Sequence, residues 1–191
     1  MEKNRLEAFS DGVIAIILTI MVLEMKVPHG DDLSALRKLL PVFLGYVLSF
    51  VYIGIYWNNH HHLLKTARNV NGRIMWANLH LLFWLSLFPF TTGWMGNNPF
   101  SSVPSALYGA VLLAAALAYK LLQHLIVVDR GPHSKLASVI GRDVKGLIST
   151  ICYASGIGVS FFLPWLAGCL YVAVALIWLV PDRRLESVIE E

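Results

Sequence analysis

The first apolar stretch of the chain contains an aspartate that could carry charge chemistry. Asp11 follows Ser10 and precedes an apolar run that ends near Met25. A helix that began at Gly12 would have about 14 residues and measure about 21 Å, too short for a hydrocarbon core of about 30 Å. The helix should therefore begin near Leu6, with Asp11 more than a turn inside the span. An ionisable group in that position is costly unless paired, so it marks a candidate functional site.

Arg5 precedes Asp11 on the same predicted helix. It lies six positions earlier, about 120° around a helix that advances about 100° per residue, so the two side chains do not share a face. Their partners are expected on other helices. The alternative is that Ser10 or Asp11 only caps a helix start by accepting free backbone N–H groups. The length of the span favours the position inside the membrane.

Three consecutive histidines, His60, His61 and His62, could bind a transition metal or relay protons. Neighbouring helical positions point about 100° apart, so consecutive side chains do not easily converge on one ion. The seven residues on either side of the run also include no carboxylate. We therefore expect no bound metal or other cofactor. One or two of the histidines should instead lie at the membrane surface and hydrogen-bond to Asp11 or Ser10.

The chain that positions these residues has the composition of an integral membrane protein. Of its residues, 57% are hydrophobic and 14% are charged, and the mean hydropathy is +0.62. Those values lie outside the range of a soluble domain. The apolar segments predict an all-α, single-domain protein over residues 1–191 with six membrane spans, at about 6–25, 39–57, 74–92, 104–123, 144–162 and 165–180.

The basic residues predict how the chain is oriented. If Lys120 is counted with the fourth link, twelve of the 15 Lys and Arg residues lie at the termini and in the second and fourth links. The positive-inside rule then places both termini in the cytoplasm. The net charge of +3 is modest, and the basic residues are distributed according to this topology. No nucleic-acid partner is therefore expected.

Motifs of catalysis and of the common potassium filter are both missing from the sequence. GxSxG, HExxH, Walker and GxGxxG patterns are absent, so no enzyme is expected. TVGYG is also absent, and the third link, about 93–102, is too short for a pore helix and a filter. A potassium pathway in this chain would have to work without a cage of backbone carbonyls.

The first span carries an apolar stripe. At about 100° per residue, Gly12, Ile16 and Leu23 fall within about 40° of one another, and Thr19 and Ile20 flank them. The residues alone favour a stripe that faces lipid or a protein core, and they leave pore lining open as the alternative. The six-span block is not repeated within the chain, so a central pathway would need several copies.

The run Arg5-x-x-x-Phe9-Ser10-Asp11 at the start of a six-span chain resembles the signature of the endosomal/lysosomal potassium channel family (transmembrane protein 175). Further positions also resemble that family's pattern, although only the first span carries a sharp motif. The resemblance implies a structural network of hydrogen bonds and ion pairs made by Arg5, Ser10, Asp11, Trp57, His60, His61 and Asn78.

The same resemblance implies roles on the first helix. In that family this helix lines the pore, the isoleucine five positions after the aspartate forms a hydrophobic constriction, and the threonine eight positions after it contributes to selectivity. These positions correspond to Ile16 and Thr19. Leu23, one heptad after Ile16, extends the constriction by periodicity. The animal form has two repeats and works as a dimer, so one repeat implies a homotetramer.

The sequence therefore predicts a potassium-selective cation channel in a prokaryotic cell membrane. Its partners would be other copies of the chain, the lipid bilayer and permeant monovalent cations, with K⁺ bound only in passage. Two alternatives stay open. One is a proton-coupled transporter of a small solute that uses Asp11 and the histidines as a relay. The other is a membrane-embedded metal-dependent enzyme.

Overall fold

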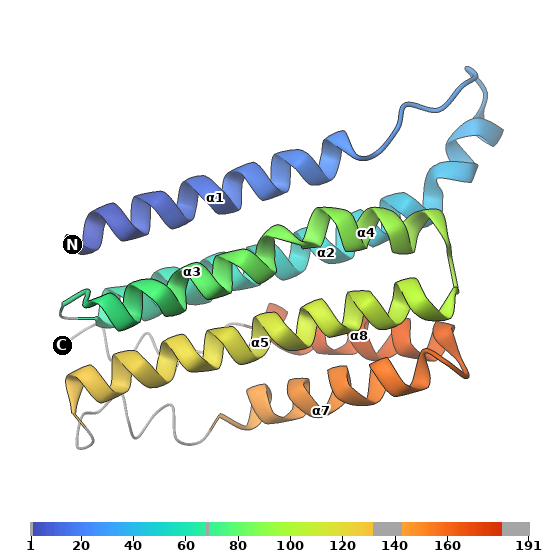
Figure 1. Ribbon diagram of the computed structural model, residues 1–191. Helices are drawn as coiled ribbons and strands as arrows, with labels where there is room; N and C mark the ends of the chain where they lie inside the picture. Colours follow the sequence, from blue (N-terminus) through green and yellow to red (C-terminus); the bar gives the residue numbers. More distant parts are fainter. Residues whose placement is uncertain (1, 68, 132–142, 181–191) are drawn as a thin grey trace.

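The computed structural model describes residues 2–67, 69–131 and 143–180, and all regular structure in these ranges is helical (Figure 1). The α3 and α4 helices meet at Leu87 and together form one long apolar segment, Gly72–Asn97. The helices are α1 (Lys3–Leu23), α2 (Leu33–Thr66), α3 (Gly72–Ser86), α4 (Phe88–Asn97), α5 (Ser102–Arg130), α7 (Val144–Val159) and α8 (Pro164–Leu179).

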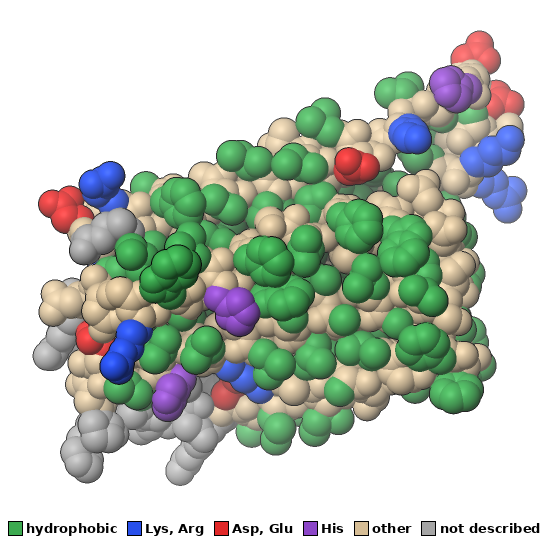
Figure 2. Space-filling view, in the orientation of Figure 1, with side chains coloured by type: hydrophobic (Ala, Val, Ile, Leu, Met, Phe, Trp, Pro, Cys, Tyr) green, Lys and Arg blue, Asp and Glu red, His purple; other side chains and the backbone are tan. Residues whose placement is uncertain are grey.

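Four of these segments are long and apolar enough to cross a membrane: α1, α2, α3 with α4, and α5. The α7 and α8 helices are apolar but have 16 residues each, about 24 Å of helix. Figure 2 shows a broad hydrophobic band across this face of the molecule, with most charged side chains toward its two ends. This arrangement is that of a multi-pass membrane protein.

The α1 helix begins at Lys3, three residues before the expected start. Ser10 and Asp11 therefore lie well inside the helix, and the alternative in which one of them caps its start is wrong. The hydroxyl of Ser10 donates to the carbonyl of Leu6, one turn earlier, at 2.8 Å. The length of the hydrocarbon core thus located the start of α1 to within a turn.

The α2 helix extends beyond its expected span at both ends. It begins at Leu33, where the carboxylate of Asp32 accepts the amide of Ala35 at 2.9 Å. That bond and the hydroxyl of Ser34 hold the pKa of Asp32 below its usual value. At the other end the helix continues through polar residues to Thr66, because backbone hydrogen bonding does not stop where hydrophobicity does.

Two prolines mark bends. Pro41 lies inside α2, where its missing N–H and its ring disturb the helix. Figure 1 shows the first turns of α2 bent away from the rest of that helix. The α3 helix ends at Leu87, and Pro89 lies in the first turn of α4.

The helices pack around α2, α3 and α5. In Figure 1, α1 lies along one side, and α5, α7 and α8 lie on the opposite side of α2, α3 and α4. The α2 and α4 helices approach closely at Gly96, where an added Cβ would lie 2.8 Å from the Cα of Val42. The residues that α1 buries all lie on one face: Leu6, Ser10, Ile14, Ile17 and Met21. Its opposite face is left uncovered.

Candidate functional site

A chain of buried hydrogen bonds joins α1, α2 and α3. His60 and the carbonyl oxygen of the Asn78 amide are 2.6 Å apart, measured from Nε2 to Oδ1. The amide nitrogen of Asn78 donates to the hydroxyl of Ser10 at 2.9 Å. All three side chains are at most 1% exposed. His60 therefore contacts Asn78 and not, as we expected, Ser10 or Asp11 directly.

The direction of these bonds fixes the tautomer of His60. The Asn78 oxygen is the acceptor, so the neutral His60 ring must carry its proton on Nε2. Its other nitrogen, Nδ1, is buried and has no hydrogen-bond partner among the described residues. The chain of donors then runs from His60 through Asn78 and Ser10 and ends at the backbone carbonyl of Leu6.

A second set of contacts joins α1 to α2 on the neighbouring face. The indole nitrogen of Trp57 donates to a carboxylate oxygen of Asp11 at 3.0 Å. One turn away, Nδ1 of His61 lies 2.6 Å from a carboxylate oxygen of Glu7. The rings of Trp57 and His61 stack at 6.3 Å between centroids. The helices are antiparallel, so two rungs spaced by one turn hold them in register.

Glu7 was missed in the sequence, and its spacing could have revealed it. Glu7 and Asp11 are four residues apart, and so are Trp57 and His61. Residues at that spacing lie on one face of a helix. A pair of such faces on two antiparallel helices allows both rungs at once. One or two of the histidines were expected to contact Asp11 or Ser10, and the structure places His61 on Glu7 instead.

Two of the basic or titratable residues stand apart from this network. Arg5 is exposed and makes no hydrogen bond or ion pair with any described residue of the protomer. His62 uses Nδ1 within its own helix, 2.9 Å from the carbonyl oxygen of Asn58. Across residues 2–67, 69–131 and 143–180, no three His, Cys, Asp or Glu side chains gather as a metal site would require.

The stripe on α1 is exposed in the protomer, on the face opposite to the one that packs against α2 and α3. Ile16 is 59% exposed and Leu23 is 74% exposed. A Cβ added to Gly12 would meet nothing within 4 Å. The hydroxyl of Thr19 is also exposed and donates to the carbonyl of Ala15 at 2.9 Å, the bond expected if Thr19 only satisfies its own helix. Its oxygen lone pairs stay unused by that bond.

The uncovered surface continues from α1 onto α4. A groove of about 670 Å³ runs between the two helices, with Ile16 and Ile20 on one wall and Phe90 and Trp94 on the other. The carboxylate of Glu24 also lines it. The groove therefore joins the exposed stripe on α1 to an apolar surface on α4.

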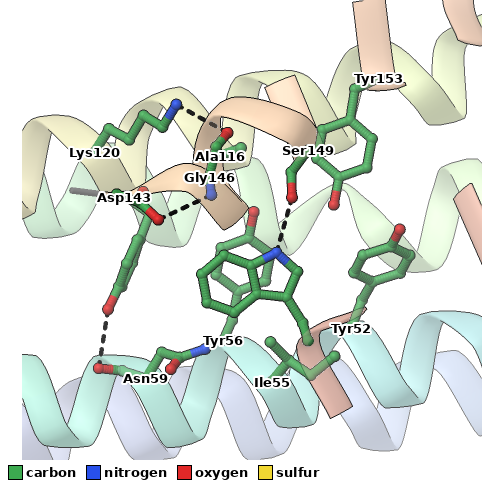
Figure 3. Close-up of a pocket in the computed structure, with 12 residues that line it drawn as sticks. Tyr52, Ile55, Tyr56, Asn59, Ala116, Lys120, Asp143, Gly146, Ser149 and Tyr153 are labelled. Carbon is green, nitrogen blue, oxygen red and sulfur yellow. Dashed lines mark hydrogen bonds between the residues drawn. The ribbon is translucent and has the colours of Figure 1, made fainter. Parts of the chain in front are cut away.

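A separate cavity of about 40 Å³ lies between α2, α5, α7 and α8 (Figure 3). The ammonium of Lys120 donates to the carbonyl of Gly146 at 3.0 Å and to the hydroxyl of Thr150 at 2.8 Å. Asp143 accepts from the amide of Gly146 at 2.9 Å. The cavity has room for about three waters. None of the residues that line it comes from α1, so it is not continuous with the exposed stripe.

The buried chain of hydrogen bonds predicts a stability effect. Replacing Asn78 by leucine would leave the buried His60 N–H without its acceptor, whereas the Ser10 hydroxyl would lose one donor and keep its bond to Leu6. Each buried group left unpaired costs about 1–3 kcal/mol, so Asn78→Leu should clearly lower the unfolding temperature in detergent. Asn97→Leu is the control, because the Asn97 side chain is exposed and bonds only its own helix. Equal unfolding temperatures for the two variants would contradict the prediction.

Comparison with known proteins gives a consistent picture. The model of the family described as endosomal/lysosomal potassium channel TMEM175 matches residues 5–89. "Potassium channel HX13_20290" of Chryseobacterium sp. (strain P1-3) is 54% identical over the full length of both chains. The human "Endosomal/lysosomal proton channel TMEM175" is 25% identical over 92% of this chain but only 37% of its own length.

A solved structure is also similar. It is described as a lysosomal potassium-selective channel TMEM175 homolog from Chamaesiphon minutus. It aligns with a TM-score of 0.82 at 27% sequence identity and covers 94% of this chain and 97% of that one. The similarity therefore extends past the residues that the family model matches and includes α5, α7 and α8.

Proposed function

The chain belongs to the family of the endosomal/lysosomal potassium channel TMEM175, and from this membership we propose that it conducts potassium selectively through a pore lined by α1 helices of several copies. The proteins it resembles are channels and not enzymes. The metal-dependent enzyme is therefore no longer an alternative.

The uncovered stripe on α1 is the observation that supports the proposal most directly. Ile16, Thr19 and Leu23 are exposed in the protomer, although α1 is an apolar helix held on its opposite face. Several copies arranged around an axis would bring these side chains together. The human relative has room for more than one six-span block, since this chain covers 37% of it. A dimer of two-block chains contains four blocks, so a chain with one block would need four copies. This supports a homotetramer with α1 innermost.

Such an assembly gives a physical route to selectivity. Four Ile16 side chains on the axis form an apolar ring that water leaves readily. An ion crosses the ring after shedding part of its hydration shell. Potassium is larger than sodium and holds its water less tightly, so it loses less. No cage of backbone carbonyls is needed, and Leu23 forms a second narrow point nearer the end of α1.

The polar network is assigned a structural role in this proposal. Asp11 is engaged by Trp57, and His61 by Glu7, so these groups hold α1 against α2. The runner-up, a transporter with a proton relay, would need an unbroken chain of exchangeable groups. The chain from His60 instead ends at the backbone carbonyl of Leu6, which cannot pass a proton on.

Ion flux in liposomes tests the function. Purified protein in vesicles with a potassium gradient should release potassium faster than sodium, without saturation and without a proton gradient. Proton flux should be measured alongside, because the human relative is named a proton channel. Flux that saturates and stops without a proton gradient would favour the transporter. Equal rates for potassium and sodium would contradict selectivity.

Thr19 supplies a prediction about selection. Its hydroxyl hydrogen is used by Ala15, so the oxygen lone pairs can face a passing cation and replace lost water. Thr19→Val keeps the shape and removes the oxygen, so the ratio of potassium to sodium flux should fall. Thr19→Ser keeps the oxygen and should retain the ratio. An unchanged ratio in Thr19→Val would mean that the hydroxyl serves only its own helix.

A further inference from the structure

A groove on the side of the molecule away from α1 runs between the first turns of α3 and the last turns of α5. It measures about 820 Å³ and opens outward. Figure 2 shows charged and histidine side chains at this end of the α3 and α5 face, next to a surface that is mostly hydrophobic. The groove is lined by Asn71, Gly72, Arg73, Trp76, Ala77, His80, Leu121 and Leu125.

The groove sits where the membrane surface should be. Arg73 is the last charged residue before Lys120, so the chain from 74 to 119 carries no charged side chain. Trp76, one turn further along α3, is 71% exposed. Tryptophan at the end of an apolar span is typical of the boundary between headgroups and acyl chains. The groove therefore spans this boundary, with a charged end and an apolar end.

The charged end fits a phosphate. Arg73 is exposed and has no hydrogen bond or ion pair with any described residue. The neighbouring carboxylate, Asp129, is already held by the amide of Asn71 at 3.0 Å. A guanidinium binds phosphate oxygens through two parallel hydrogen bonds. The described part of the groove offers no free carboxylate for an amine, so a net negative headgroup fits better than a zwitterionic one.

The apolar end fits an acyl chain. Trp76, Leu121 and Leu125 form its walls. His80 lies at the far end, and its Nε2 accepts the indole N–H of Trp84 at 2.9 Å. The neutral ring therefore carries its proton on Nδ1 and can donate to an ester carbonyl. Arg73 and His80 are seven residues apart on α3, about 10 Å along the helix axis.

We propose that this groove binds an anionic phospholipid, with its phosphate on Arg73 and an acyl chain against Trp76, Leu121 and Leu125. The lipid comes from the leaflet on the side where α1 begins. The site also acts on the helix that positions α1. Asn78 is two residues from His80 and about 160° around α3, so it reaches Ser10 from the opposite side of the same helix. A bound lipid would therefore hold α3 in the position in which Asn78 contacts Ser10.

Quenching of Trp76 fluorescence by lipids with brominated acyl chains tests the site. The chain has six tryptophans, so the Trp76 signal is taken as the difference between the unmodified protein and Trp76→Phe. In mixed bilayers, brominated phosphatidylglycerol should displace unbrominated lipid near Trp76 about five times more effectively than brominated phosphatidylcholine, the preference expected for one basic residue at a surface. Arg73→Gln should remove this preference. Arg37→Gln removes an exposed arginine on α2 and should leave it unchanged.

Several results would overturn the proposal. Equal quenching by the two lipids in the unmodified protein would exclude a preference for the anionic headgroup. A preference that survives Arg73→Gln would place the phosphate elsewhere. Loss of the preference when inorganic phosphate is added would indicate a site for a free anion, and no quenching by either lipid would mean that protein covers the groove. None of these measurements involves ion flux, so their failure is distinct from failure of the channel proposal.

Discussion

Ile16→Asn is expected to raise cation flux about tenfold and to let sodium pass with potassium. A tenfold rise corresponds to a barrier lower by about 1.4 kcal/mol. Ile16 is 59% exposed in the protomer and lies in the middle of α1, so in the proposed assembly four copies form a dry ring. Four amides in the same place would keep water in the ring, and ions could then cross with more of their hydration intact.

The measurement is potassium and sodium flux into liposomes at matched protein content. Ile151→Asn is a matched control, because Ile151 on α7 is 56% exposed and lies away from α1. It introduces the same amide at the same exposure and should leave both fluxes unchanged. If Ile16→Asn alters neither the flux nor the selectivity, α1 does not line the pore.

Gly12→Leu is expected to abolish most of the assembled oligomer while leaving the protomer folded. A Cβ at Gly12 meets nothing within 4 Å in the protomer, so the larger side chain creates no clash there. Gly12 shares the face of α1 that carries Ile16 and Thr19. Small residues on such a face let helix backbones approach closely in a membrane, and leucine would hold neighbouring copies of α1 apart.

Size-exclusion chromatography with light scattering in detergent would measure the assembly. Gly168→Leu is the control, because Gly168 on α8 also has open space around it and lies far from α1. The control should remain oligomeric. Oligomers of normal size in Gly12→Leu would mean that α1 helices do not meet near this position, and the proposed pore would have to be formed elsewhere.

The sequence predicted the all-helical class, the membrane setting and the family, because each depends on features that single segments carry. The start of α1 followed from the thickness of the bilayer, and the position of Asp11 inside that helix followed from the start. The ends of α2 could not be predicted in the same way. Helical hydrogen bonding there continues into polar residues, and the hydrophobic pattern does not indicate where among them the helix begins or ends.

The partners within the network were harder to predict, because they depend on how each helix is rotated against its neighbours. Ser10, Asn78 and His60 were all expected in the network, but which of them touch depends on α3 lying between the other two helices. Glu7 was missed because its role as a partner of His61 becomes visible only from the helix face that it shares with Asp11. Arg5, which the resemblance placed in the network, makes no hydrogen bond or ion pair with any residue that the structure describes.

The contacts of α1 are unevenly distributed along its length. Glu7, Ser10 and Asp11 hold the first half to α2 and α3 through directional hydrogen bonds. Beyond Asp11, no side-chain hydrogen bond joins α1 to another described helix, and Ile14, Ile17 and Met21 hold it by apolar packing alone. Apolar contacts have no preferred direction, so they set the rotation of a helix less sharply than hydrogen bonds do. We therefore expect α1 to be stiff near Glu7 and more compliant near Leu23.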